Sequence, residues 1–352
     1  MTSEPSAPMT PPRRVLIIKP SSLGDIVTAT PVLRGLRRSF PQAHIAWLVN
    51  SEYAPLLRDD TDLNELILFE RGKFRRLRKW PAALADLARL RRQARAGEFD
   101  WAIDLQGLLR SGLFAAASGA ELRAGFATPR EPAARWFYTH PIATTSDHTV
   151  DRNVDLARGL GIDALREDMT LQVSPAAQQS IDSLLRRHGL ERRGFAICVP
   201  PTRWKTKLYP LRHWRNVIAG LAGQSPVVVL GAGGWEKRLC DQVSEGLGQG
   251  VVNLAGQTGI AEMVALIAAA ACVISSDSAA AFIAHAVGVG AVVLLGPTRA
   301  ERTGPGPGGI PLVAQVPCRG CLKRRCRHVT CMESIAPAEV LAAVEKLASP
   351  AR

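Results

Sequence analysis

The chain lacks the features of a membrane-spanning or secreted protein. No stretch reaches the ~18 consecutive apolar residues that a membrane span requires. Residues 1–12 are rich in Pro, Ser and Thr and lack the apolar centre of a signal peptide. We therefore expect a disordered tail over residues 1–13 and a cytoplasmic protein, in which the seven cysteines are mostly reduced.

Two common nucleotide-binding signatures are also missing. The nearest match to the glycine-rich dinucleotide fingerprint, Gly231-Ala232-Gly233-Gly234, has Glu236 where the third glycine belongs. No Walker lysine loop occurs anywhere in the sequence. These absences weigh against NAD-linked chemistry and against a P-loop nucleotidase.

What the sequence does contain is a repeated alternation of short apolar strands and helices. The predicted strands cover residues 14–18, 44–49, 65–69 and 101–105, and then 195–199, 227–230, 251–254, 272–275 and 291–295. Such alternation predicts an α/β fold with parallel, doubly wound sheets. Because 352 residues exceed the usual size of one core, we expect two Rossmann-like domains facing a central cleft. Their predicted bounds are 14–172 and 173–352.

Polar residues follow two predicted strands of the first half. The loop Lys19-Pro20-Ser21-Ser22-Leu23-Gly24-Asp25 joins the first strand to a predicted helix at 26–39. Ligands of open α/β sheets bind beyond the carboxyl ends of the strands, so Asp25 is a candidate for chemistry; a helix N-cap is the alternative. A second loop, residues 104–111, carries polar groups toward the same edge.

Four loops of the second half carry groups suited to a nucleotide. Thr202 and Lys207 are apt partners for a pyrophosphate. Glu236 suits ribose hydroxyls, and Thr258 would border a base. The turn Ser275-Ser276-Asp277-Ser278 leads into a predicted helix at 279–287, whose N-terminus favours phosphate. Each loop alone is compatible with ordinary turn and cap residues, but their joint occurrence predicts a nucleotide-sugar site.

The net charge of +13 is concentrated in one segment. Residues 71–95 hold ten Lys or Arg and a single acid, Asp86. Such a run can be a solvated helix face, or it can meet an anionic membrane surface or an acidic lipid. Nucleic acid is a third candidate, but the few aromatics there, Phe74 and Trp80, give little support to base stacking. We therefore expect either an anionic lipid or membrane partner or a solvated helix face, and no nucleic-acid partner.

A cluster of four cysteines marks the C-terminal part. Its pattern is Cys318-x2-Cys321-x4-Cys326-x4-Cys331. In a reducing compartment this favours a structural zinc or iron site, although the spacing is tighter than in a zinc ribbon. Free thiols and disulfides are the alternatives. The other three cysteines, Cys198, Cys240 and Cys272, are expected to pack in the core.

These motifs together resemble glycosyltransferase family 9, the heptosyltransferases that build the inner core of lipopolysaccharide. The resemblance runs from Arg14 to the C-terminal helix. It rests on the loops 19–25 and 104–107, the block 202–214 and the turns 275–278 and 295–298. It implies a GT-B architecture and inverting transfer of heptose from ADP-heptose to the Kdo/heptose inner core. It also implies an acidic acceptor of the lipid A–Kdo type, no cofactor required for catalysis, and work at the cytoplasmic face of the inner membrane.

The resemblance further implies roles for individual residues. Asp25 would be the general base that takes the proton of the acceptor hydroxyl. The donor contacts would be Thr202, Lys207, Glu236, Thr258, Asp277 and Ser278, and the acceptor-side residues Ser21, Ser22, Gly24, Gln106 and Arg110. Similar cysteine clusters occur in some members of the family, so this one need not indicate nucleic-acid binding.

One departure from the family pattern motivates a rival hypothesis. The family follows its Asp-Ser/Thr pair with Gly-x-x-His, whereas this chain reads Ala279-Ala280-Ala281-Phe282. His285, three residues further on, is the candidate for partial substitution. The alternative is an enzyme of the same family that uses another nucleotide sugar, linked to UDP or GDP. A further alternative is a non-enzymatic nucleic-acid binder that acts through the basic runs and the metal cluster.

Overall fold

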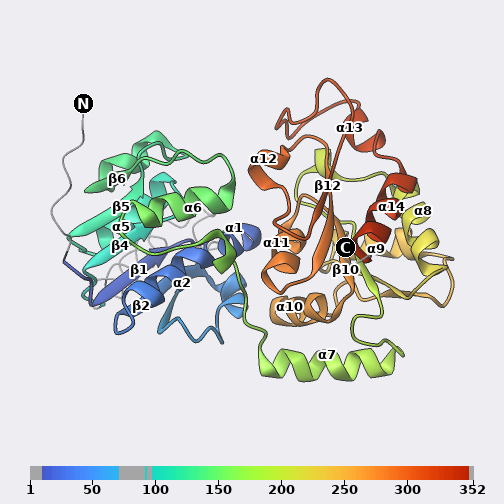
Figure 1. The fold of residues 1–352 in the computed structure, drawn as a ribbon, viewed down its shortest axis with the longest axis horizontal. Helices are drawn as coiled ribbons and strands as arrows, with labels where there is room; N and C mark the ends of the chain where they lie inside the picture. Colours follow the sequence, from blue (N-terminus) through green and yellow to red (C-terminus); the bar gives the residue numbers. More distant parts are fainter. Residues whose placement is uncertain (1–9, 71–91, 93–96, 349–352) are drawn as a thin grey trace, which may run out of the picture. The chain divides into compact units, whose positions relative to one another are not determined.

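The structure, a computed structural model, describes residues 10–70, 92 and 97–348 (Figure 1). They form two compact units, the first within residues 1–22, 29–146 and 150–168, the second within 23–28, 147–149 and 169–352. Apart from Arg92, the predicted basic run at 71–95 lies outside the described residues, as does most of the predicted tail. In the part of the chain that is described, no helix is long and apolar enough to cross a bilayer.

The first unit is built on a parallel six-stranded sheet with the order β3-β2-β1-β4-β5-β6. Its strands are β1 (Arg14–Ile18), β2 (His44–Asn50), β3 (Glu65–Phe69), β4 (Trp101–Asp104), β5 (Leu122–Phe126) and β6 (His140–Ile142). Central β1 is buried on both faces from Val15 to Ile18, as its run of branched apolar residues predicts. The four predicted strands are confirmed. The short β5 and β6 were not predicted, since β5 contains Arg and Gly and the edge strand β6 contains Pro141.

The segment predicted as one helix at 26–39 forms two. Helix α1 covers Leu23–Val27 and α2 covers Thr30–Ser39. The break has a local cause: Pro31 stands in the first turn of α2 and has no N–H to continue a helix from α1. Asp25 therefore lies within α1 rather than at a helix N-cap, which makes the N-cap interpretation wrong.

Among the described residues, the remaining helices of the first unit flank the sheet. They are α5 (Leu109–Ala117), α6 (Thr149–Arg158) and the short 3-10 turns η1 (Ser51–Leu56), η3 (Pro132–Phe137) and η4 (Arg166–Asp168). The core on one face includes Leu16, Ile18 and Phe99, with Phe69 and Phe114 packed edge to face at 5.2 Å between ring centroids.

The second unit repeats the plan with the strand order β12-β11-β10-β7-β8-β9, again wholly parallel. Its strands are β7 (Ala196–Val199), β8 (Val227–Val229), β9 (Val251–Asn253), β10 (Cys272–Ser276), β11 (Gly290–Leu295) and β12 (Ile310–Val313). Five of the six were predicted. The edge strand β12, which contains Pro311, was not.

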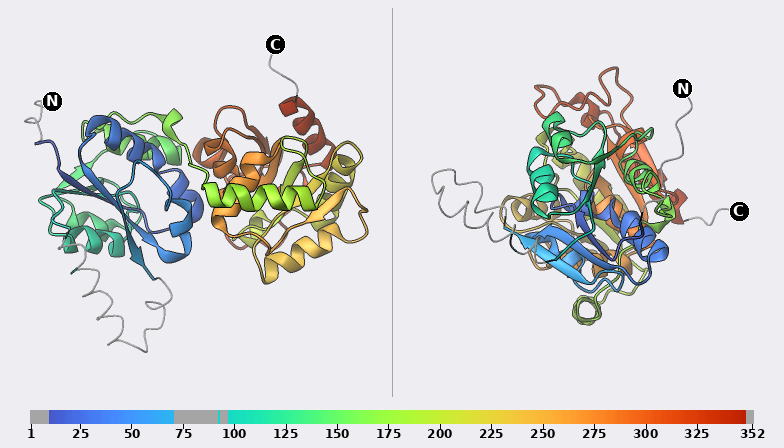
Figure 2. Two further views of the ribbon diagram at one scale, coloured as in Figure 1. Left: turned by 90° about the horizontal axis from the view of Figure 1, so that it is seen from below. Right: turned by 90° about the vertical axis from the view of Figure 1, so that its left-hand side faces the viewer.

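Helices cover both faces of this sheet (Figure 2). They are α7 (Pro175–Arg187), α8 (Leu211–Ala222), α9 (Trp235–Ser244), α10 (Ile260–Ala269), α11 (Ala279–Ala286), α12 (Ala300–Thr303), α13 (Thr330–Glu333) and α14 (Pro337–Ala348), with a 3-10 turn η5 (Lys205–Lys207). Trp214 of α8 is fully buried in a core that also contains Cys198, Cys240 and Cys272. Burial raises the pKa of Cys240 to about 12 and that of Cys272 to about 11. The prediction that these cysteines serve core packing is confirmed.

Candidate functional site

In the first unit, the two predicted polar loops lie side by side beyond β1 and β4. The backbone N–H of Ser21 donates to Oε1 of Gln106 at 3.3 Å. Nζ of the buried Lys19 donates to the carbonyl of Leu105. Ser21 and Ser22 are half-buried. The structure thus brings together Ser21, Ser22 and Gln106 of the predicted acceptor side.

The second of these loops is fixed by a carboxylate at its base. Asp104 is fully buried and accepts hydrogen bonds from the backbone N–H groups of Gln106 (2.8 Å) and Gly107 (3.2 Å) and from the Tyr138 hydroxyl (2.6 Å). Burial raises the pKa of Asp104, because the loss of solvation outweighs these hydrogen bonds. The contribution of Tyr138 was not predicted, and no local sequence signal links two residues so far apart.

Arg110 begins the helix that follows the same loop. It lies in the first turn of α5, and its guanidinium stands 5.3 Å from the ring centroid of Phe69, at the end of β3. A cation on a ring keeps its N–H groups directed outward for an anion. This position suits the predicted contact with an acidic acceptor.

Asp25 lies on α1, which belongs by its contacts to the second unit. Its neighbour Gly24 packs against the start of α11: a Cβ placed on Gly24 would lie 3.3 Å from Cδ2 of Phe282 and 3.4 Å from Cα of Ala279. The carboxylate of Asp25 is half-buried, in the first turn of its helix. A glycine is therefore the residue that allows α1 to approach α11 this closely.

A buried ion pair of the second unit joins two predicted donor residues. Nζ of Lys207 donates to Oδ2 of Asp277 at 2.9 Å and to the Asp277 carbonyl at 3.1 Å. Their side chains are only 13% and 6% exposed. The hydroxyl of Thr303 donates to the same Oδ2 at 3.1 Å. Two loops that lie 70 residues apart in sequence are thus joined at the carboxyl ends of β7 and β10.

Several buried hydroxyls without partners lie in the same strand-end segments as this ion pair. The hydroxyls of Ser275, Ser276, Ser278 and Thr298 have no hydrogen-bond partner among the described residues. They belong to the ends of β10 and β11 and to the turns that follow. A buried unpaired polar group costs about 1–3 kcal/mol, and each such group needs an explanation. A polar ligand held at these strand ends would satisfy them.

Glu236 and Thr258 belong to two loops that lie in contact. The N–H of Gly256 donates to the carbonyl of Gly231 at 2.8 Å, which joins the loop after β9 to the loop after β8. Glu236 lies in the first turn of α9, and its Oε2 accepts the N–H of Ala232 at 2.9 Å. One carboxylate oxygen therefore holds the loop, and the other is the one suited to a ribose hydroxyl.

The candidate substitute for the missing histidine is in the last turn of α11. The ring of His285 occupies the space where a Cβ on Gly306 would be, 2.5 Å from that position. Phe282, which stands where the family has His, lies three residues before it, about 4.5 Å along the helix axis. The partial substitution by His285 stays a prediction.

The four clustered cysteines lie near one another but form no ligand set. Cys318, Cys321 and Cys326 are exposed, whereas Cys331 is buried at the start of α13. Backbone N–H groups of Val329 and His328 lower the pKa of Cys326, while burial and the other three thiols raise that of Cys331. Within residues 10–70, 92 and 97–348, no group of three or more His, Cys, Asp or Glu is arranged to hold a metal ion. The metal site stays a prediction.

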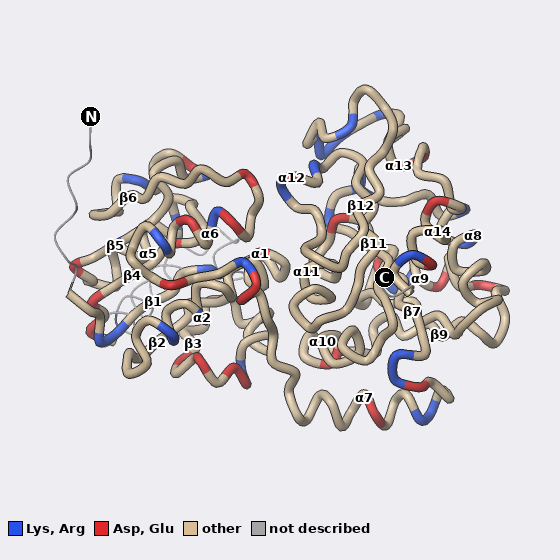
Figure 3. The backbone as a smooth tube through the Cα atoms, in the orientation of Figure 1, with Lys and Arg blue, Asp and Glu red and all other residues tan. Residues whose placement is uncertain are grey.

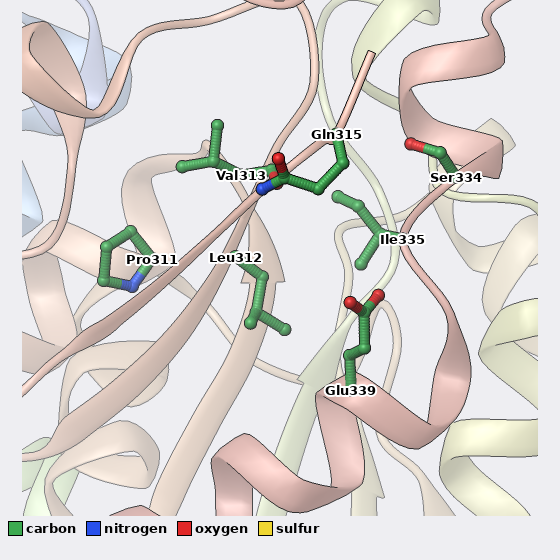
Figure 4. Close-up of a pocket in the computed structure, with 7 residues that line it drawn as sticks. All are labelled: Pro311, Leu312, Val313, Gln315, Ser334, Ile335 and Glu339. Atoms are coloured by element: carbon green, nitrogen blue, oxygen red, sulfur yellow. The ribbon is translucent and has the colours of Figure 1, made fainter.

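A cavity of about 300 Å³ lies at the β12 edge of the second sheet (Figure 4). Its lining residues are Pro311, Leu312, Val313, Gln315, Ser334, Ile335 and Glu339. Glu339 is the only titratable group of that lining, and its Oε2 accepts the N–H of Ala336 at 2.8 Å. None of the predicted site residues lines this cavity, so it is not the candidate site.

Comparison with known proteins agrees with the arrangement of these loops. The model of glycosyltransferase family 9 (heptosyltransferase) matches residues 87–331. The lipopolysaccharide heptosyltransferase 1 of Pseudomonas aeruginosa is 26% identical over 330 residues, which cover 90% of this chain and 88% of that protein.

Solved structures share the fold over nearly the whole chain. A glycosyl transferase of family 9 from Veillonella parvula matches with a TM-score of 0.81 and 18% identity, covering 96% of this chain and 97% of that one. The E. coli heptosyltransferase WaaC with ADP-2-deoxy-2-fluoro heptose matches with a TM-score of 0.75 and 22% identity, covering 95% and 99%.

A more distant structure is described as containing iron. The dodecameric iron-containing heptosyltransferase TibC in complex with ADP-D-beta-D-heptose matches with a TM-score of 0.57 and 14% identity, over 97% of this chain and 77% of that one. The predicted α/β, GT-B fold is confirmed by these matches. A family model that covers residues 87–331 leaves no doubt of the enzyme class: the chain is a glycosyltransferase and belongs to glycosyltransferase family 9, the heptosyltransferases.

Proposed function

We propose that the chain transfers heptose, with inversion, from ADP-heptose to the Kdo/heptose inner core of lipopolysaccharide. The observation that carries this proposal is the set of polar groups at the ends of β10 and β11: the buried Lys207–Asp277 pair, together with buried hydroxyls that have no partner among the described residues. It is supported by a lipopolysaccharide heptosyltransferase relative that aligns with 90% of the chain. Family membership also argues against a non-enzymatic nucleic-acid binder.

The reaction is a single displacement at the anomeric carbon. The acceptor hydroxyl oxygen forms the new C–O bond while the bond from the anomeric carbon to the diphosphate oxygen breaks, and ADP leaves with the electron pair. Asp25 takes the proton from the attacking hydroxyl. A carboxylate within hydrogen-bond reach of that hydroxyl is what such a step needs.

The donor-side residues bind the diphosphate and the nucleoside. The negative charge that grows on the leaving ADP is stabilised by Lys207, Thr202, Ser278 and the N-terminus of α11. Asp277 holds the ammonium of Lys207 in place. The free oxygen of Glu236 accepts from ribose hydroxyls, and Thr258 borders the adenine.

The acceptor-side residues are those of the loops 21–24 and 106–110. Ser21, Ser22 and Gln106 offer hydrogen bonds to sugar hydroxyls, and Gly24 lets the helix that carries Asp25 pack closely on α11. Arg110 pairs with acidic groups of the acceptor. The enzyme acts at the cytoplasmic face of the inner membrane, where the basic run at 71–95 meets anionic lipid.

A second candidate function keeps the reaction and changes the donor. Phe282 stands where the family has His; it is 8% exposed and packs beside the Gly24 position. An apolar ring at this place removes a hydrogen-bond donor from the donor site, which favours a different sugar or base. A UDP- or GDP-linked sugar is the specific alternative.

The four clustered cysteines are proposed to bind a structural zinc or iron ion with no part in the reaction. Support comes from the pattern Cys318-x2-Cys321-x4-Cys326-x4-Cys331, which places four free thiols in one loop and the start of α13. Metal analysis of the purified protein, with Cys326→Ser alongside, tests this. A molar equivalent of metal that the substitution removes is the expected result, and metal-free wild type would leave the cysteines as free thiols.

The experiment that tests the function is nucleotide release from a panel of ADP-, UDP- and GDP-sugars with a lipid A–Kdo type acceptor. Wild type is compared with Asp25→Asn and with Asp59→Asn, which changes an exposed carboxylate. We expect acceptor-dependent ADP release from ADP-heptose that only Asp25→Asn abolishes. Release from another donor alone would overturn the heptose assignment, and full activity of Asp25→Asn would overturn the base.

A further inference from the structure

The segment that carries three of the four clustered cysteines has a role of its own in the second unit. This cysteine-rich loop, residues 318–329, joins β12 to α13 and is basic along much of its length (Figure 3). Neither the reaction nor the proposed metal site accounts for the positive charge of this loop. Its cations are Arg319, Lys323, Arg324, Arg325 and Arg327.

The loop is docked on the segment that bears Lys207. The hydroxyl of Thr206 donates to the carbonyl of Lys323 at 2.9 Å. The guanidinium of Arg324 lies 4.6 Å from the ring centroid of Trp204. Nζ of Lys207 lies 4.5 Å from the same centroid. One indole ring therefore holds two cations that are more than a hundred residues apart in sequence.

The other side of the loop is fixed to the turn after β11. The N–H of Leu322 donates to the carbonyl of Pro297 at 2.7 Å, and that of Gly320 donates to Gly296 at 2.9 Å. Thr298, which follows Pro297, is 5% exposed and has one of the hydroxyls without a partner among the described residues. The loop thus borders the same buried polar cluster as Lys207 and Asp277.

Charge balance distinguishes the two cations. The ammonium of Lys207 is opposed by the carboxylate of Asp277 at 2.9 Å. Arg324 has no carboxylate within ion-pair distance in the described ranges 10–70, 92 and 97–348, and its side chain is exposed. The leaving diphosphate gains negative charge. Lys207 alone, whose positive charge is already opposed by Asp277, does not balance that charge. The planar guanidinium also fits phosphate oxygens in a bidentate manner, which an ammonium does not.

We infer that Arg324 is a second diphosphate-binding residue of the nucleotide-sugar donor, held, like Lys207, against the Trp204 ring. The cysteine-rich loop is then part of the donor site. This inference rests on the proposed function, because the proposed function assigns the leaving diphosphate to the ends of β7 and β10. It predicts that substituting Arg324 weakens the binding of each ligand in proportion to its phosphate charge and leaves the binding of the nucleoside unchanged.

The test is isothermal titration calorimetry of the full chain with ADP and with adenosine. The variants are Arg324→Ala, Arg324→Lys and, as a matched control, Arg325→Ala, whose side chain is also exposed on the same loop. We expect Arg324→Ala to raise the Kd of ADP about tenfold, equivalent to about 1.4 kcal/mol. Arg324→Lys should restore part of the affinity, Arg325→Ala should stay within twofold of wild type, and adenosine should bind all variants alike.

Two results would overturn the inference. If Arg324→Ala binds ADP as wild type does, Arg324 does not contact the diphosphate. If it weakens adenosine as much as ADP, its role is to support Trp204 and not to bind phosphate. Both differ from a failure of the proposed function, in which wild type binds ADP but releases none from ADP-heptose in the presence of acceptor.

Discussion

The hydroxyl of Tyr138 donates to the buried carboxylate of Asp104 at 2.6 Å. Through its other oxygen, Asp104 holds the N–H groups of Gln106 and Gly107. Gln106 in turn accepts the N–H of Ser21. A residue far from the proposed chemistry therefore determines where the acceptor-side loops lie.

Tyr138→Phe should lower the free energy of unfolding by about 1–3 kcal/mol, since it leaves a buried acceptor with one donor fewer. Urea denaturation measures this change. Because Asp104 fixes the loops 21–22 and 106–107, the KM for acceptor should rise while the Kd of ADP stays at the wild-type value. Trp136→Phe, at a side chain that is 82% exposed, is the control. An unchanged acceptor KM would show that the tyrosine contributes only to stability.

The buried carboxyl of Asp104 should also give the stability a pH dependence. Its pKa is raised above the ordinary 3.8 by burial, so the folded chain holds this proton more tightly than the unfolded chain. Unfolding then releases a proton between the two pKa values, and stability falls as pH rises from about pH 4 upward. Asp104→Asn should remove this fall. Denaturant unfolding over a pH series measures the change of stability with pH for wild type and for Asp104→Asn. Equal slopes for the two proteins would show that Asp104 is not the source of the pH dependence.

Gly125→Ala should destabilise the first unit. A Cβ at Gly125 would lie 2.4 Å from ring atoms of Tyr138, so the ring would be forced away from Asp104. Overpacking of this kind costs about 1–3 kcal/mol. At Gly223 the nearest atom to a Cβ is 3.6 Å away, and Gly223→Ala should leave the unfolding midpoint unchanged. A stable, fully active Gly125→Ala protein would mean that the Tyr138 ring can shift to another position without loss of stability.

Lys207→Met should cost about 3 kcal/mol of stability, because it leaves Asp277 as a buried charge without its ion-pair partner. Lys205→Met, at an exposed lysine of the same turn, should cost little. The double variant Lys207→Met/Asp277→Asn should recover part of the loss. Chemical denaturation of wild type, Lys207→Met, Asp277→Asn and the double variant gives the coupling energy of the pair, and a value near zero would show that the pair is fully hydrated.

The sequence predicts the sheets well because their signal is local. Runs such as 15–18 and 227–229 are apolar and short, and they became buried parallel strands. β6 and β12 escaped prediction because each is only three or four residues long and contains a proline. Asp25 was misplaced as a candidate N-cap because α1 begins at Leu23, two residues before it, within a loop whose Ser, Leu and Gly gave no helix signal.

The candidate site was predictable only where its residues follow strands. Asp277 and Lys207 lie at strand ends, and their contact follows from the meeting of parallel strands at one edge. Tyr138 on Asp104 and Arg324 on Trp204 are contacts between distant segments, for which no spacing rule exists.

The two prolines in the edge strands have a consequence for the behaviour of the protein at high concentration. Pro141 in β6 and Pro311 in β12 each remove a backbone N–H from the outermost strand of their sheet. An edge without that donor is a poor template for a strand from another molecule. Each sheet therefore resists growth by strand addition at that border, which protects a two-sheet enzyme from aggregation through its edges.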